Sequence, residues 1–161
     1  MAEDTLITAE EMRNDAAEAV YALSKDIKTS RIELYLNSAS LRLRSWVGDE
    51  IYDDALSDAD VSALTEAEQR KIRQRRKLLK AAEGDLTMSY LIVNLNSAVA
   101  PKGLLVETRA EGQTVERYMT PDQTRARAQE FFEQACQLVQ PYLLGGNIPD
   151  SEFVIEEIEI V

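Results

Sequence analysis

The sequence contains no histidine and a single cysteine, Cys136. A disulfide within one chain is therefore impossible, and zinc sites built from cysteine and histidine clusters are excluded. The same absences exclude the Ser–His and Cys–His forms of nucleophilic catalysis. The sequence also lacks the phosphate-binding patterns G-x-x-x-x-G-K-[ST] and G-x-G-x-x-G, and the G-x-S-x-G turn of hydrolases. We therefore expect neither an enzyme nor a resident cofactor or metal ion.

No stretch contains the roughly 18 consecutive apolar residues that a membrane-spanning helix requires. The first residues, MAEDTLITAEEM, are acidic, unlike the basic start of a secretory signal peptide. Apolar residues make up 45% of the chain and charged residues 29%, which is an ordinary globular composition. These features predict a soluble protein of the reducing cytoplasm, without membrane contact.

Acidic residues dominate and give a formal net charge of -11, but the charge is uneven. One run holds only basic charges: Arg70, Lys71, Arg73, Arg75, Arg76, Lys77 and Lys80. Such a run is most often a solvated surface, here with Glu66, Glu68 and Glu83 supplying partial pairing. It also suits contacts between copies of the chain, or DNA phosphates held without sequence recognition.

The longest predicted helix runs from Thr65 to about Ala98 and contains this basic run in its first half. Thr65 and Glu68 have the spacing of a capping box. Apolar residues recurring every three, four or seven positions predict one buried face: Ile72, Leu79, Ala82, Leu86, Tyr90 and Val93. Gly84 lies in the interior, where glycine costs about 1 kcal/mol relative to alanine, so a kink there is one option.

Three further helices are predicted. Thr8 and Glu11 form a second capping-box pair and open a helix that extends to about Leu23. Thr120-Pro121 opens the last helix, which closes near Pro141. Between them, a helix from about Ser30 to Gly48 has an apolar stripe of Ile32, Leu36, Ala39, Leu43 and Trp46. Tyr35, Arg42 and Arg44 fall off that stripe and are expected to be more exposed.

The acidic segment between Gly48 and Thr65 is loosely patterned and predicts a loop, with a short helical turn around Ile51 to Leu56. It is no calcium loop, because its acids do not follow the D-x-[DN]-x-[DN]-G spacing: Asp49, Asp53, Asp58 and Asp60.

A small β-hairpin is predicted at about residues 104–118, around Glu111-Gly112. A polar two-stranded hairpin is rarely stable alone, so we expect a projection that packs against another element or protein. Its polar side chains are Glu107, Arg109, Glu111, Glu116 and Arg117. Residues 147–161 predict an extended C-terminal arm with unpaired, apolar, partner-binding side chains: Phe153, Val154, Ile155, Ile158 and Ile160. Such an arm needs a pairing partner, either its own hairpin or another protein through strand addition.

The predicted fold is thus mainly α, a bundle of about four helices including one long helix, with the hairpin and the arm. Residues 1–146 form the helical domain and residues 147–161 the arm. The order of "LITAEEM", "SASLRLRSWVG", "LTMSYLIVNLN" and "VETRAEGQTVERY" resembles the small head–tail connector proteins of tailed bacteriophages, also called head-completion or adaptor proteins. The resemblance covers about Leu6 to Leu144, and the chain departs from the family in its long basic run and its longer hydrophobic tail.

This resemblance implies a structural virion protein of the head–tail junction, assembled in the host cytoplasm. Its copies would form a ring, commonly of twelve, beneath the portal protein. The ring would extend the DNA channel, through which genomic DNA passes without sequence recognition, and would dock the tail or a stopper protein. Two alternatives remain: a DNA-binding packaging accessory protein that uses Arg70 to Lys80, and a helical adaptor that binds a partner through its tail.

Overall fold

The structure is a computed structural model that describes residues 4–13, 27–99, 105–110, 113–118 and 121–146. The protein is mainly helical, as predicted. The described helices are α1 (Ala9–Arg13), α2 (Thr29–Val47), α3 (Asp49–Ser57), α4 (Glu66–Val99) and α5 (Pro121–Val139). Two short 3-10 helices follow α5, namely η2 (Gln140–Tyr142) and η3 (Leu144–Gly146).

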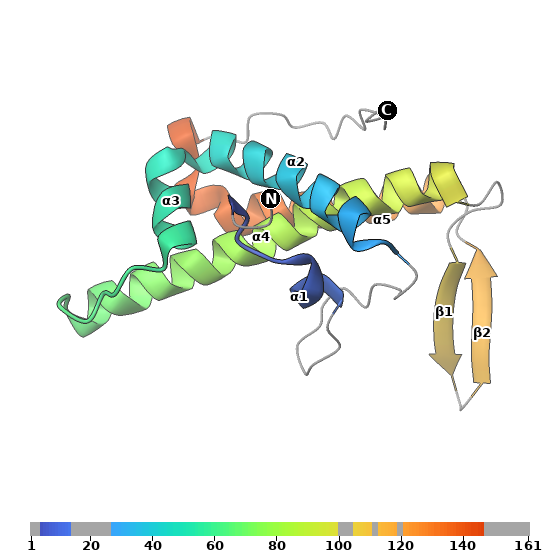
Figure 1. Cartoon of the computed structure of the whole chain (residues 1–161), viewed down its shortest axis with the longest axis horizontal. Helices are drawn as coiled ribbons and strands as arrows, with labels where there is room; N and C mark the ends of the chain where they lie inside the picture. Colours follow the sequence, from blue (N-terminus) through green and yellow to red (C-terminus); the bar gives the residue numbers. More distant parts are fainter. Residues whose placement is uncertain (1–3, 14–26, 100–104, 111–112, 119–120, 147–161) are drawn as a thin grey trace.

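The long helix α4 is the centre of the structure, and α5 and α2 pack along its second half (Figure 1). Leu79, Ala82 and Leu86 of α4 are fully buried, and they meet α2 and α5 in one apolar cluster. Within it, the rings of Trp46 and Phe132 pack edge to face with centroids 5.6 Å apart. Leu79, Ala82 and Leu86 of the predicted face are therefore buried as predicted, whereas Ile72, Tyr90 and Val93 are half-buried, and residues 82–89 are buried on every side of the helix.

Both predicted capping boxes are present. The amide of Glu11 donates to Thr8 Oγ1 (3.1 Å) while the amide of Thr8 donates to Glu11 Oε2 (2.9 Å). Thr65 and Glu68 make the same reciprocal pair at 3.2 and 3.3 Å. These bonds satisfy amides that the first turn of a helix leaves without a partner. The rest of the first predicted helix lies outside the described residues.

The expectation that Tyr35 is exposed is wrong, because its side chain is 0% exposed. α2 is buried beyond its stripe: Tyr35 joins the stripe residues Ile32 and Leu36 in a second cluster with Ile7, Met12 and Phe131. The later stripe residues pack in the first cluster, namely Ala39, Leu43 and Trp46. An interpretation based on one apolar stripe misses the burial of Tyr35, since it assumes that only one side of the helix packs against another element. Arg42, also off the stripe, is half-buried and lies over the Phe132 ring at 4.8 Å.

The acidic segment is also more ordered than the sequence predicts, since α3 occupies nine of its residues. Gly48 has a φ of 87°, a backbone conformation that glycine adopts without steric cost, so α3 begins directly after α2. Tyr52 is fully buried and anchors α3 to the core. Gly84 does not interrupt α4, which continues through this residue as one helix.

Two strands, β1 (Leu105–Ala110) and β2 (Gln113–Tyr118), pair in antiparallel register. Glu107 pairs with Glu116, and Arg109 pairs with Thr114. Figure 1 shows this pair beyond the C-terminal end of α4. Their side chains, and residues 111–112 between them, lie outside the described part of the chain.

Replacing Leu86 with alanine tests the central place of α4. Leu86 is 0% exposed, whereas Leu64, in the loop before α4, is 41% exposed. Because a buried leucine leaves a cavity behind, Leu86→Ala should lower the free energy of unfolding by about 2–5 kcal/mol. The matched control Leu64→Ala should change it by less than about 0.5 kcal/mol. Urea unfolding followed by Trp46 fluorescence measures both, and equal effects would contradict the assignment.

Candidate functional site

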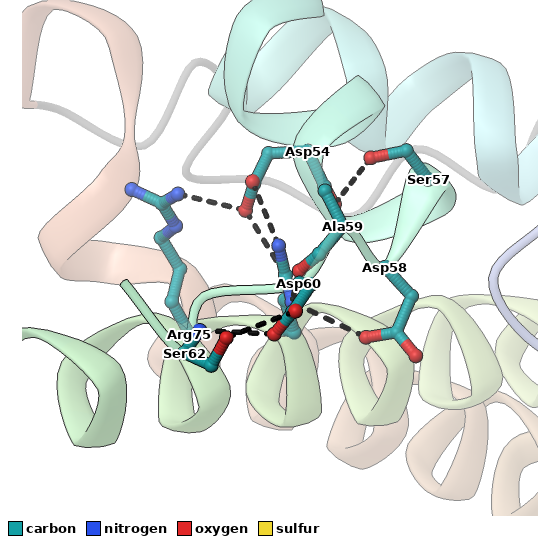
Figure 2. Close-up of polar contacts among 8 residues, drawn as sticks. Asp54, Ser57, Asp58, Ala59, Asp60, Ser62 and Arg75 are labelled. Atoms are coloured by element: carbon teal, nitrogen blue, oxygen red, sulfur yellow. Dashed lines mark hydrogen bonds and ion pairs between the residues drawn. The ribbon is translucent and has the colours of Figure 1, made fainter. Parts of the chain in front are cut away.

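The first half of α4 carries a charged site in which two arginines hold one carboxylate of α3. Arg75 Nη2 donates to Asp54 Oδ2 at 2.9 Å, and Arg76 Nη2 donates to Asp54 Oδ1 at 3.0 Å. Figure 2 shows Asp54 of α3 facing Arg75 of α4. A second bond from Arg76, Nε to Asp54 Oδ2 at 3.2 Å, makes this pair bidentate. We call Asp54, Arg75 and Arg76 the α3–α4 clamp.

The clamp also fixes the end of α3. Arg76 Nη1 donates to the carbonyl oxygen of Ala59 at 2.9 Å and to Asp58 Oδ1 at 3.3 Å. Asp58 itself has a φ of 46°, a left-handed conformation that ends the helix. Beyond it, Asp60 accepts bonds from the amide and hydroxyl of Ser62, both at 2.9 Å. The acidic segment is therefore folded onto the basic helix by its own carboxylates and carbonyls.

Burial and pairing make the clamp stronger than an ordinary surface ion pair. The Arg76 side chain is only 10% exposed and that of Asp54 is 28% exposed. Hydrogen bonds from Arg76 lower the pKa of Asp54 below its ordinary value, against the opposing effect of burial. The same pairing with Asp54 raises the pKa of Arg76.

The structure divides the seven predicted contact residues into two groups. Arg75 and Arg76 belong to the clamp, and Lys80 Nζ pairs with Glu11 Oε1 at 2.6 Å. Four residues are exposed and in no described ion pair: Arg70, Lys71, Arg73 and Lys77. Arg70, Arg73 and Lys77 follow at intervals of three and four residues, which places them on one side of the helix. We call these three residues the basic stripe.

The partners of the basic run are not those predicted. Asp54, Asp58 and Glu11 supply the described pairing, whereas Glu66, Glu68 and Glu83 were expected to do so. The sequence could not show this, because the true partners lie 18 to 69 positions away. α3 also presents acids outward: Asp49 and Asp53 share Arg44, at 3.2 and 2.8 Å, and Glu50 is exposed beside them.

Glu83 is a functional candidate that the sequence interpretation missed. Its side chain is 0% exposed. Oε1 accepts bonds from the amides of Leu6 (2.7 Å) and Ile7 (3.3 Å), and Oε2 accepts the hydroxyl of Tyr52 at 2.6 Å. Ser40 Oγ lies 2.8 Å from the same hydroxyl. This one carboxyl thus joins the N-terminal segment, α2, α3 and α4.

The sequence signal for this hub is a pair of acids, Glu83 and Asp85, between the buried apolar residues Ala82 and Leu86, and it does not show which of the two is the hub. Burial raises the pKa of Glu83 to about 7, although the bonds from Tyr52 and the two amides oppose the rise. Burial, then the charge of Glu83, raises the pKa of Tyr52. Arg44 contributes a favourable charge and stacks over the Tyr52 ring at 4.4 Å.

The remaining predicted site residues cannot be placed as side chains. Phe153, Val154, Ile155, Ile158 and Ile160 lie outside the described residues, as does Glu111. Glu107, Arg109, Glu116 and Arg117 are placed only by strand and register. Among the residues that the structure describes, no group of three or more acids or cysteines is arranged to hold a metal ion. No helix in the same part is long and apolar enough to cross a membrane.

Comparison with known protein families, with curated proteins and with solved structures finds no match to this chain. Any functional conclusion therefore depends on the surfaces described above and on the resemblance carried by the sequence.

Substitution of Asp54 tests the clamp. Because Asp54→Asn removes bonds between charged groups, it should lower the free energy of unfolding by about 1–3 kcal/mol. Asp53→Asn, whose parent side chain is 59% exposed, should cost less than about 1 kcal/mol. The pKa of Asp54 is lowered by folding, so its contribution is present above its ordinary pKa and is lost as the pH falls through the folded value. Chemical denaturation should therefore show a smaller difference in unfolding free energy between the unmodified protein and Asp54→Asn at low pH than at pH 7. The same difference at both pH values would contradict the assignment of Asp54 to the clamp.

Glu83 predicts the opposite pH dependence. Its pKa is raised from 4.5 to about 7 in the folded chain, so its contribution is fully present below 4.5 and is lost as the pH rises through about 7. Glu83→Gln keeps an acceptor for the two amides but cannot ionise. Between pH 4.5 and 8, the variant should gain about 3 kcal/mol of unfolding free energy relative to the unmodified protein.

Urea denaturation at several pH values measures this gain. The exposed control Glu10→Gln should show no comparable trend across the same range. Parallel curves for the unmodified protein and Glu83→Gln would contradict the assignment of Glu83 as a buried carboxyl that resists ionisation.

Proposed function

We propose that this chain is a structural connector of the head–tail junction, whose copies assemble side by side into a ring beneath a portal. The proposed protomer is the four-helix bundle of α1, α2, α4 and α5, with the hairpin as a projection and the arm as a partner-binding segment. The resemblance of the sequence to phage connectors supports this proposal. The charged surfaces support it independently.

The observation that carries the proposal is the coexistence of two outward surfaces of opposite charge. The basic stripe is exposed and in no described ion pair, whereas Arg75, Arg76 and Lys80 are neutralised within the chain. Glu50 is exposed on α3, next to Asp49 and Asp53, which are 79% and 59% exposed. A positive patch on one copy can meet a negative patch on the next, and such head-to-tail contacts form a ring when the rotation between successive copies closes.

The clamp gives these surfaces their separation. Arg75 and Arg76 form ion pairs with Asp54 of α3. The basic stripe on one side of α4 and the exposed acids of α3 therefore remain as distinct surfaces. A chain whose basic run were wholly unpaired would favour nonspecific polyanion binding instead. Internal neutralisation therefore favours contact between copies over bulk DNA binding.

Light scattering of the purified protein, alone and mixed with the portal protein of its own phage, tests the proposal. We expect a ring, or a monomer that joins the portal as a stoichiometric collar. Arg73→Glu should weaken this assembly roughly tenfold or more, because it places like charges in contact. Lys71→Glu is the matched control, since Lys71 is exposed but lies off the basic stripe.

The second charge reversal Glu50→Lys, added to Arg73→Glu, should restore assembly. A monomer that ignores the portal, or equal effects of Arg73→Glu and Lys71→Glu, would overturn the connector proposal.

The basic stripe also favours one alternative, a DNA-binding packaging accessory role. Arg70 and Lys77 are separated by about 10 Å along the helix, a span that reaches neighbouring backbone phosphates. That role predicts duplex binding that weakens steeply with salt and is lost in Arg73→Glu. Adding Glu50→Lys to Arg73→Glu should restore assembly between copies but should not specifically restore duplex binding. The double variant therefore distinguishes the connector role from the DNA-binding role.

A further inference from the structure

The outer face of α2 carries two exposed leucines. Across the described residues, the large apolar side chains that are exposed are Leu34 (40%), Leu41 (70%), Leu64 (41%) and Leu144 (61%). Leu34 and Leu41 are seven residues apart on α2, which is close to two helical turns, so they share one side of the helix.

Leu144 continues this line beyond the end of α2. It lies against Gly48, where a Cβ atom would be only 3.3 Å from Leu144 Cδ1. Gly48 is in turn seven residues after Leu41. Leu34 and Leu41 lie about 10 Å apart along α2, at a rise of 1.5 Å per residue, and Leu144 lies beside Gly48, where the helix ends. We call these three residues the α2 strip.

The C-terminal arm starts at one end of this strip. The described chain ends at Gly146 of η3, two residues after Leu144. In Figure 1 this end of the chain, coloured red, lies beside the junction of α2 and α3. Phe153 follows Gly146 by seven residues, and an extended chain spans up to about 3.5 Å per residue. The arm can thus bring its apolar residues over Leu41 and on to Leu34.

Charge favours the same docking. The arm contains five acids and no basic residue: Asp150, Glu152, Glu156, Glu157 and Glu159. On α2, Arg42 bonds to the Tyr90 hydroxyl and Arg44 pairs with Asp49 and Asp53, so Arg31, one turn before Leu34, is the arginine that can meet these acids. An arm tethered beside the strip also has an effective concentration in the millimolar range for short linkers, far above that of a second copy in dilute solution.

We propose that, in the free protein, the chain's own arm packs on the α2 strip, with Phe153 and Ile155 covering Leu41 and Leu34. The proposal does not depend on the connector function. It gives the apolar arm a partner in the absence of any other protein, which an unpaired strand of this composition needs. A partner that binds the arm must first displace it from α2.

Disulfide trapping in the full chain tests this contact. Ser45 is exposed one turn after Leu41, and Ser151 precedes Phe153 by two residues; Cys136 is buried and stays in every variant as background. The test chain carries Ser45→Cys with Ser151→Cys, which the proposed register places together; the control carries Glu50→Cys with Ser151→Cys. Glu50 is exposed two residues after Gly48, so it is close to the start of the arm but off the strip.

Mild oxidation with oxidised glutathione should link the test pair within one chain about tenfold faster than the control pair, as non-reducing electrophoresis will show. Adding Leu41→Ser should remove most of this difference, whereas Leu64→Ser should leave it unchanged. Similar rates for the test and control pairs would overturn the proposal. Links that form mainly between chains would also overturn it, since they would assign the strip to the arm of a second copy.

Discussion

The burial of one carboxyl, Glu83, is the constraint on which the arrangement of the helices depends. A carboxyl in an apolar interior is tolerated only when its oxygens are satisfied. The donors are the amides of Leu6 and Ile7 and the hydroxyl of Tyr52. Two separate segments, the N-terminal segment and α3, must therefore converge on the middle of α4, because loss of either leaves a buried oxygen without its bond.

The charged clamp extends the same logic to the first half of α4, which lies outside the main core. Few apolar side chains are available there, so Arg75 and Arg76 hold α3 through Asp54 instead. Apolar burial is non-directional, whereas these bonds define a geometry for the end of α3. One helix thus uses two kinds of interaction: apolar packing on α5 and α2 in its second half, and bidentate ion pairs in its first half.

The two interactions together determine which groups remain for partners. Charges inside the clamp are lost to any external ligand, and the basic stripe and the acids of α3 remain outward. On α2, packing of both Leu36 and Tyr35 into the interior leaves Leu34 and Leu41 on the opposite side. The surfaces proposed for assembly and for the arm are therefore consequences of which charges are paired in the clamp and which side of α2 packs into the interior.

The sequence by itself determined the local structure: the capping boxes at Thr8 and Thr65, the apolar face of α4, and the mainly helical fold. These depend on residues three to seven positions apart, whose geometry the helix itself sets. Only the tertiary structure decided that Tyr35 is buried, that Asp54 neutralises Arg75 and Arg76, and that Glu83 is a hub. Each of these depends on partners that are distant in sequence, and spacing along one helix contains no information about which neighbour will supply them.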